Sequence, residues 1–261
     1  MTKEKYNIGL VLSGGGVRGF AHLGAIKALS EHGIIPEVIS GTSAGAVVAA
    51  LYADGYTPDE IISLFNDRSF SKYFDICVPK MGLLKMSGLY RILTCSLKAK
   101  VFEDLNMPIF VCATNLNKGK SEYFCKGELL KPLLASSSIP VLFPPIEING
   151  DLYNDGGVLD NLPLLPIIRK SKKLIGVFVN PVGTKKNIVG LKSIAERSFQ
   201  LSISRNIPVK RLKFDLFIEP DKLSKFGVLE ISKIQDVFSI GYEYTSELLE
   251  KTDLSTFIKQ E

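Results

Sequence analysis

Residues 37–53 read EVISGTSAGAVVAALYA. Residues 37–40 are typical of a short buried strand, and the small apolar residues 46–53 predict a helix. Between them, residues 41–45 fit the G-x-S-x-G pattern of a nucleophile at a strand-to-helix turn. This chemistry needs a serine on a sharp turn, whose strained backbone leaves room only for small residues such as Gly41 and Gly45 on either side. The segment favours an α/β fold with Ser43 as nucleophile, although the G-x-S-x-G pattern also occurs by chance in loops.

A glycine-rich turn, SGGGVRG, occupies residues 13–19 between a predicted strand (residues 7–12) and a predicted helix (residues 20–31). It formally matches the dinucleotide pattern G-x-G-x-x-G. A dinucleotide site also needs an acidic residue at the end of the second strand, but Glu37 begins that strand. A phosphate-binding P-loop needs lysine after its last glycine, and Phe20 stands there. Both nucleotide interpretations are therefore disfavoured.

The remaining ligand-binding interpretation of this turn is an anion site made of backbone N–H groups at the start of a helix. Such a site suits an oxyanion hole, with donors from Gly14, Gly15 and Gly16 and a possible further one from Val17. A tight turn that binds nothing is the alternative.

A serine nucleophile needs a base, and histidine is the usual one. The only histidines, His22 and His32, both precede Ser43, so the common order of serine, acid and histidine cannot be built. We expect His22 to be a packed or hydrogen-bonded residue of the first helix. The candidate base is Asp155, which follows a short strand and precedes Gly156 and Gly157. Asp-Gly-Gly is also an ordinary turn sequence; as a base, Asp155 would need burial to raise its basicity.

The rest of the chain alternates short apolar runs with helical periods, which predicts a largely parallel sheet covered by helices on both faces. Further strands are expected at residues 109–114, 122–125 and 174–179, and a helix at residues 128–137. A capping box at Thr57 predicts another helix start. Residues 70–106 are irregular and form either a cap over a pocket or a packed insertion. Beyond residue 190 the pattern is mostly helical with an apolar interruption at residues 212–218, and the absence of a linker predicts one domain over residues 1–261.

Composition narrows the class of protein. The 261 residues are 46% hydrophobic and 23% charged, as in an ordinary globular protein. Neither a signal-peptide core nor a membrane-spanning run is evident, so the expected location is the cytoplasm. The four cysteines, without metal-ligand spacing, are expected to be free thiols: Cys77, Cys95, Cys112 and Cys125.

The net charge of +5 is unevenly placed, because residues 165–261 carry 17 basic against 11 acidic side chains. Such an excess is usually a solvated face, but it also suits an anionic lipid surface. The cluster Arg205, Lys210, Arg211 and Lys213 alternates with short apolar residues and is the candidate contact with a membrane. No basic motif interleaved with aromatics is present, which argues against a nucleic-acid partner.

Taken together, residues 14–19, 41–45 and 155–157 resemble, in order, the three motifs of the patatin-like phospholipase family. Residues 135–140, 143–145 and 161–163 also resemble family segments, so that the resemblance covers about residues 7–180.

The resemblance implies a three-layer α/β/α fold and a Ser43–Asp155 dyad that hydrolyses acyl esters of lipids through an acyl-enzyme, without metal or other cofactor. For Arg18 three roles stay open: it orients the glycine loop, it binds a phosphate group, or it forms a surface or structural ion pair. Acyl transfer by the same dyad, or a lipid-binding protein with a vestigial site, are the alternatives.

Overall fold

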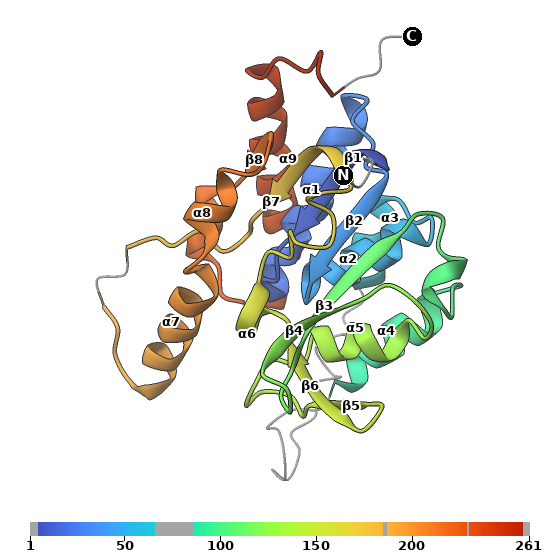
Figure 1. Cartoon of the computed structure of the whole chain (residues 1–261). Coiled ribbons are helices and arrows are strands. Elements are labelled where there is room, and N and C mark those ends of the chain that lie inside the picture. The colour runs from blue at the N-terminus through green and yellow to red at the C-terminus, as the bar shows by residue number, and fades with distance from the viewer. Residues whose placement is uncertain (1–4, 66–85, 185–186, 229, 258–261) are drawn as a thin grey trace.

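A parallel sheet forms the centre of the protein (Figure 1). The computed structural model describes residues 5–65, 86–184, 187–228 and 230–257. Five strands run parallel in the order β3-β2-β1-β7-β8. Their bounds are β1 Tyr6–Leu12, β2 Val38–Thr42, β3 Ile109–Asn115, β7 Ser171–Val177 and β8 Leu216–Ile218. The largely parallel sheet predicted from the sequence is confirmed.

Three antiparallel strands extend the sheet beyond β3: β4 (Lys120–Phe124), β5 (Ile146–Ile148) and β6 (Asp151–Asp155). β4 and β6 were anticipated, whereas β5 was not, because a three-residue strand between turns gives little periodic signal. β8 lies where the sequence showed only an apolar interruption in a helical region.

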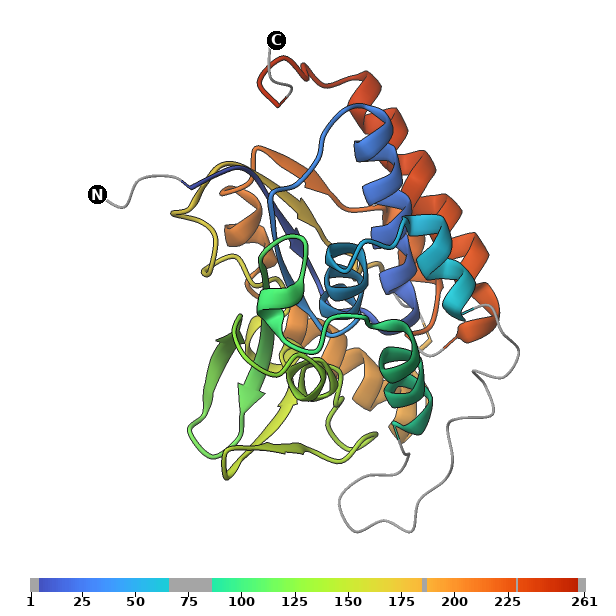
Figure 2. The ribbon, with the colours of Figure 1, turned by 90° about the vertical axis from the view of Figure 1, so that its right-hand side faces the viewer.

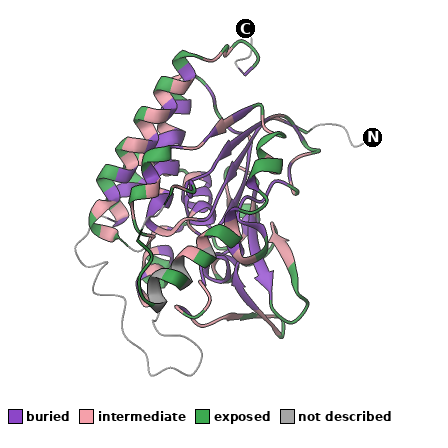
Figure 3. Ribbon diagram, turned by 90° about the vertical axis from the view of Figure 1, so that its left-hand side faces the viewer, coloured by how far each residue is buried: buried purple, intermediate pink, exposed green. Residues whose placement is uncertain are grey.

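Helices cover both faces of the sheet, as expected of a three-layer α/β fold (Figure 2). Along β1, Leu10 and Leu12 pack with side chains of α1, α2 and α9, whereas Val11 packs on the other face with Leu162 and Ile207. This alternation follows from the two-residue period of a strand. The five parallel strands are accordingly mostly buried and the outer helix surfaces exposed (Figure 3). The helices are α1 Phe20–Glu31, α2 Ala44–Ala53, α3 Pro58–Phe65, α4 Ser87–Ser96, α5 Leu130–Ser136, α6 Gly157–Asp160, α7 Leu191–Ser204, α8 Ile207–Arg211 and α9 Ile234–Glu250.

The C-terminal helix α9 packs along α1, far from it in sequence (Figure 2). Two glycines allow the close approach. A Cβ on Gly24 would lie 2.2 Å from the Phe238 carbonyl oxygen, and one on Gly241 would lie 2.2 Å from that of Ala21. The C-terminal residues beyond the recognised motifs thus complete the layer that carries α1.

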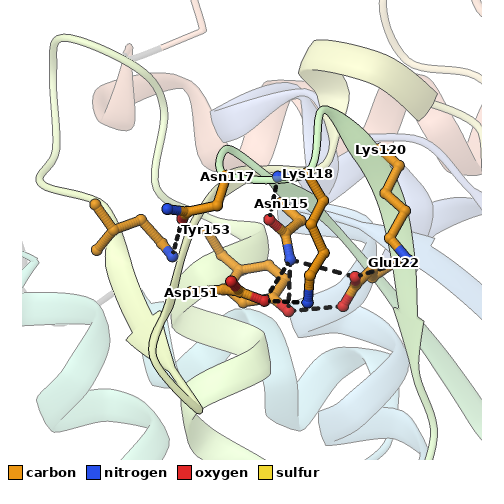
Figure 4. A network of polar contacts seen from close by, with 8 residues as sticks. Asn115, Asn117, Lys118, Lys120, Glu122, Asp151 and Tyr153 are labelled. Carbon is orange, nitrogen blue, oxygen red and sulfur yellow. Dashed lines mark hydrogen bonds and ion pairs between the residues drawn. The ribbon is translucent and has the colours of Figure 1, made fainter.

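A polar network joins the ends of β3, β4 and β6 (Figure 4). The Asn115 amide donates to the Tyr153 hydroxyl at 3.0 Å and to the Asp151 carboxylate at 3.0 Å. The Tyr153 hydroxyl in turn donates to Glu122 at 2.6 Å, and Lys118 pairs with Asp151. These contacts help to fix the register of β6, on which the position of Asp155 depends.

Several local predictions can be compared with the structure. The capping box is confirmed, because the Glu60 carboxylate accepts from the Thr57 amide and the Thr57 hydroxyl accepts from the Glu60 amide. α2 begins two residues earlier than predicted, directly after Ser43.

The irregular stretch 70–106 is only partly described, because residues 66–85 lie outside the described residues. Cys77 lies among them, and the three described cysteines are free thiols. No described helix has the length and apolarity needed to span a bilayer.

Candidate active site

Ser43 stands between the end of β2 and the start of α2 with φ 53° and ψ −122°. A positive φ is strained for a residue with a side chain, so the surrounding packing must impose it. Gly41 and Gly45 make that packing possible. A Cβ on Gly41 would lie 2.6 Å from the Gly45 carbonyl, and one on Gly45 would lie 2.6 Å from the carbonyl oxygens at the end of β1. The turn thus has the geometry that the G-x-S-x-G pattern predicts.

A second serine braces this turn from α5. The Ser43 amide donates to the Ser136 hydroxyl at 2.8 Å, and that hydroxyl donates to the Cys112 carbonyl oxygen at 2.6 Å. Ser136 therefore ties the nucleophile turn to β3.

Asp155 reaches Ser43 because two strands end against the same edge of β3. β2 runs parallel to β3 and its last residue, Thr42, is in register with Cys112. β6 runs in the opposite direction and its last residue, Asp155, is in register with Ala113, the next residue of β3. Since β4 occupies the other edge of β3 at these positions, β2 and β6 meet end to end. The carboxyl ends of both strands thereby deliver Ser43 and Asp155 to one point.

The Asp155 carboxylate is buried, and its surroundings oppose its charge. Burial raises the pKa of Asp155 to about 6, while hydrogen bonds from the Ser43 side chain and the Gly157 amide partly offset that rise. The Gly157 amide lies 2.7 Å from the carboxylate oxygen. Gly156 allows the turn to pass close to β3, because a Cβ there would lie 2.3 Å from the Cys112 carbonyl oxygen. The arrangement holds a carboxylate of increased basicity against a serine hydroxyl.

The glycine-rich turn places its amides differently from the sequence prediction. Gly14 donates its N–H to the Asn161 carbonyl oxygen at 3.1 Å, and Val17 donates to that of Val228 at 2.9 Å. Each backbone amide has a single hydrogen to donate. In this structure neither the Gly14 amide nor the Val17 amide is free to donate to an oxyanion. Among the described residues, the amides of Gly15 and Gly16 have no hydrogen-bond partner, and these two remain as candidate donors.

Arg18 has a structural role in this geometry. It is buried, and its guanidinium donates through two nitrogens to the Phe226 carbonyl oxygen. Of the roles considered for Arg18, orienting the loop is the one this contact fits.

Both histidines bond to main-chain carbonyls. His22 is buried and its Nε2 lies 2.7 Å from the Ser13 carbonyl oxygen, while His32 Nδ1 lies 2.8 Å from that of Ala28. Burial lowers the pKa of His22 to about 4, so the ring is neutral at pH 7. These contacts agree with the expectation that His22 is hydrogen-bonded and packed.

An apolar cavity of about 140 Å³ opens beside Ser43. Its walls come from the glycine turn, α1, α2, α3, α4 and the segment after α5. Val228 and Ile231, from the C-terminal region, also line it, although no sequence motif had suggested their role. The lining residues are Gly16, Val17, Gly19, Phe20, Ser43, Ala44, Val47, Val48, Ile61, Phe65, Met86, Leu89, Ser137, Ile139, Phe143, Val228 and Ile231.

The short helix after Asp155 is anchored by Lys210, one of the basic residues predicted to meet a membrane. Lys210 Nζ pairs with the Asp160 carboxylate and donates to the Leu162 carbonyl oxygen. Tyr123 donates its hydroxyl to the same carboxylate at 2.6 Å. The lysine charge is thus neutralised within the fold, and Lys210 is not available for an anionic headgroup.

Arg211, its neighbour, is also engaged. It pairs with Glu219 at 3.2 Å and lies over the Phe217 ring at 5.1 Å. The predicted four-residue cluster therefore reduces to Arg205 and Lys213, both exposed, next to the exposed apolar side chains of Val209 and Leu212.

The region that contains these residues is similar to a known protein family. A family model for patatin-like phospholipase matches residues 10–168, which include Ser43, Asp155 and the glycine turn. Lysophospholipase NTE1 of Kluyveromyces lactis is 28% identical over 276 residues, covering 93% of this chain and 19% of that protein. A patatin-like phospholipase domain-containing protein of Caenorhabditis elegans is 27% identical over 278 residues, covering 92% of this chain and 20% of that protein. The chain thus spans about a fifth of the length of these relatives.

Among solved structures, VipD from Legionella pneumophila superposes with a TM-score of 0.63 at 18% sequence identity. The match covers 95% of this chain and 67% of that one. It is a likeness of fold.

Proposed function

The chain belongs to the patatin-like phospholipase family, and on that premise we propose that it hydrolyses carboxylic esters of lipids with Ser43 as nucleophile and Asp155 as general base. One observation carries the proposal. A serine on a strained turn lies beside a buried carboxylate, whose pKa burial raises and the Ser43 side chain partly lowers, at the wall of an apolar cavity. This combination supplies a nucleophile, a base and room for an acyl chain.

In the acylation step, Ser43 Oγ attacks the ester carbonyl carbon while its proton passes to the Asp155 carboxylate. The carbonyl oxygen gains negative charge, which the amides of Gly15 and Gly16 stabilise at the positive end of the helical turn that follows. As the tetrahedral intermediate collapses, Asp155 returns the proton to the leaving alcohol. The products of this step are an acyl ester of Ser43 and the released alcohol.

In the deacylation step, Asp155 takes a proton from water as the water oxygen attacks the acyl carbonyl. The same two amides stabilise the second oxyanion. As this intermediate collapses, Asp155 returns the proton to Ser43 Oγ, which restores the Ser43 hydroxyl and releases the carboxylic acid. An Asp in water, with a pKa of about 3.9, would be a weak base for either step, and its burial beside Ser43 makes it a stronger one.

The substrate class follows from the cavity and from the relatives. The apolar walls beside Ser43 suit an acyl chain and offer few partners to a polar headgroup. Relatives over the same region are named lysophospholipases. We therefore expect phospholipids or lysophospholipids to be substrates, with the chain in the cavity and the headgroup outside it.

A fluorophosphonate probe is expected to label Ser43 and no other serine, because the turn holds an activated hydroxyl beside unpartnered amides. Labelling by intact protein is located by peptide mass mapping. Ser43→Ala should abolish both labelling and release of fatty acid from a panel of phospholipids and simple acyl esters. Ser136→Ala is a useful comparison, because it removes a nearby hydroxyl that only braces the turn and should remain labelled at Ser43. Labelling elsewhere in folded protein, or full esterase activity of Ser43→Ala, would contradict the proposal.

The enzyme is also expected to bind anionic bilayers peripherally and reversibly through α8 and the residues that flank it. This helix lies beside α6, the short helix after Asp155, because Lys210 pairs with Asp160. The exposed Leu212, directly after α8, can enter the headgroup boundary while Arg205 and Lys213 each contribute about 1 kcal/mol near an anionic surface. Co-sedimentation with phosphatidylserine-containing vesicles should be measurable at 0.1 M salt and lost at about 1 M, where the Debye length falls to about 3 Å.

The matched variants for this measurement avoid Lys210, whose reversal would break its pair with Asp160. Arg205→Glu with Lys213→Glu should lower pelleting at 0.1 M salt. Lys126→Glu with Lys131→Glu makes the same charge change after β4 and within α5, a helix that packs on the opposite face of the sheet from α8, and should leave pelleting unchanged. Equal pelleting of both double variants and the wild type would show that the basic residues around α8 are exposed to solvent and do not bind the membrane.

A further inference from the structure

The peptide groups of the glycine turn are held by their carbonyl oxygens, one after another. The Ser13 carbonyl oxygen contacts His22 Nε2 at 2.7 Å. The Gly14 carbonyl oxygen accepts from the side-chain amide of Asn180. The Gly15 carbonyl oxygen accepts from the Arg18 amide at 3.2 Å. Every peptide unit of the turn that leads up to the proposed oxyanion donors is therefore oriented by a specific contact.

In a trans peptide the C=O and the following N–H point in opposite directions. No cis peptide bond occurs in the described chain, so the Gly14 carbonyl and the Gly15 N–H are directed to opposite sides of the turn. Whatever holds the Gly14 carbonyl therefore also aims the Gly15 amide.

The order of the strands shows which residues flank the glycine turn on each side. β1 lies between β2 and β7, with Leu12 in register with Gly41 on one side and Val177 on the other. Ser43 follows the end of β2, and Asn180 follows the end of β7. The turn after β1 thus has Ser43 on one flank and Asn180 on the opposite flank. A Gly14 carbonyl held toward Asn180 directs the Gly15 N–H toward Ser43.

We propose that Asn180 is a positioning residue for the oxyanion hole, whose carboxamide holds the Gly14 carbonyl on the β7 side of the turn and so aims the Gly15 N–H at the oxygen of the reacting acyl group. The inference rests on the proposed function and names a residue that contacts neither Ser43 nor Asp155 in any described hydrogen bond. Three features of Asn180 support it.

Asn180 is completely buried, and its amide nitrogen is the only group of the side chain that can meet a carbonyl oxygen. Its Oδ1 has no hydrogen-bond partner in the described protein. A buried oxygen without a partner lowers stability, so packing alone does not explain a carboxamide at this position. The side chain also touches the turn directly, since both of its terminal atoms lie 3.5 Å from the position of a Cβ on Gly15. A residue kept at such a cost, in this contact, fits a role in aiming the loop.

The test compares Asn180→Leu with Thr245→Val in the full chain. Leucine has the same branched skeleton as asparagine and cannot donate, so the first variant frees the Gly14 carbonyl. Thr245 is equally buried, in α9, and its hydroxyl donates to the Gly241 carbonyl oxygen at 2.7 Å. Valine keeps its shape without the hydroxyl, so this variant controls for the loss of a buried hydrogen bond to a main-chain carbonyl as such. Active sites are counted by complete fluorophosphonate titration, and kcat is expressed per titrated site.

We expect Asn180→Leu to lower kcat per site by about 10- to 100-fold, which is less than the roughly 10²–10³-fold effect of deleting an oxyanion donor. KM should change by no more than about twofold, because the interaction is used mainly in the transition state. Thr245→Val should leave kcat per site unchanged. Asn180→Ala should repeat the kcat loss and serves if the leucine variant does not fold.

Wild-type kcat per site in folded Asn180→Leu and Asn180→Ala would overturn the role of Asn180 while Ser43-dependent hydrolysis by the wild type stands. Absence of Ser43-dependent hydrolysis in the wild type is a different result, which overturns the proposed function itself.

Discussion

Asp155→Asn is expected to lower kcat by at least about 10³-fold while Ser43 remains in its strained turn. The asparagine keeps the size of the side chain and an oxygen that can accept from the Gly157 amide. It cannot take the Ser43 proton, because an amide is not a base at neutral pH. A loss of three orders of magnitude corresponds to about 4 kcal/mol of transition-state stabilisation. The measurement is kcat on a soluble acyl ester, with circular dichroism to verify folding.

The control for this variant is His32→Gln. Its ring contacts only the Ala28 carbonyl in the described protein, and its loss should leave kcat unchanged. His22→Gln is a poorer control, since His22 contacts the carbonyl of Ser13 directly before the glycine turn. A fall of kcat by three orders of magnitude in folded His32→Gln, or wild-type turnover by Asp155→Asn, would eliminate a serine–aspartate pair as the catalytic unit.

Much of the fold could be predicted because its signals are local. The parallel strands are apolar runs, and the turns after β1 and β2 need glycines that stand out in the sequence. The position of Ser43 is encoded within five residues by the demands of a sharp turn. Asp155 was reached by elimination, since both histidines precede Ser43.

The remaining features depend on contacts between distant segments, which no local pattern encodes. The meeting of Ser43 and Asp155 depends on the register of β2 and β6 along β3. The loss of Gly14 as a donor depends on a carbonyl of Asn161. Asn180 looks like any polar residue after a strand, and only the order of β2, β1 and β7 shows that it flanks the glycine turn.

The basic cluster near the C-terminus shows the same limit for charges. In sequence, Lys210 is one of four similar cations, but its partner Asp160 lies 50 positions away in the chain. A count of charges therefore predicted four free basic side chains, whereas Lys210 forms an ion pair with Asp160 at the end of α6.

The burial that raises the basicity of Asp155 also lowers the stability of the folded protein when the carboxylate is charged. We therefore expect the free energy of unfolding and kcat/KM to change over the same range of pH. With a folded-state pKa of about 6 against an ordinary value of 3.8, Asp155 favours folding only while it is protonated. Its contribution is fully present below about pH 4 and is lost as the pH rises through about 6. Over the same interval the carboxylate becomes available as a base, so kcat/KM should rise toward a plateau above pH 7.

Asp155→Asn removes this titration, so at neutral pH the inactive variant should gain stability relative to the wild type. The difference in unfolding free energy between Asp155→Asn and wild type, measured by urea denaturation, should increase by about 2.4 kcal/mol between pH 4 and pH 8. The full shift in pKa corresponds to about 3 kcal/mol, and part of that is already lost at pH 4, where the unfolded carboxyl is about half ionised. Comparing the two proteins at each pH cancels the contributions of other groups, including His22, whose pKa also lies near 4. Ser43→Ala provides the matched control, because it inactivates the enzyme but keeps the buried carboxylate and should retain the pH dependence of stability. A difference that stays constant from pH 4 to pH 8 would mean that Asp155 ionises as freely as in the unfolded chain, and that its burial does not supply the basicity that the mechanism requires.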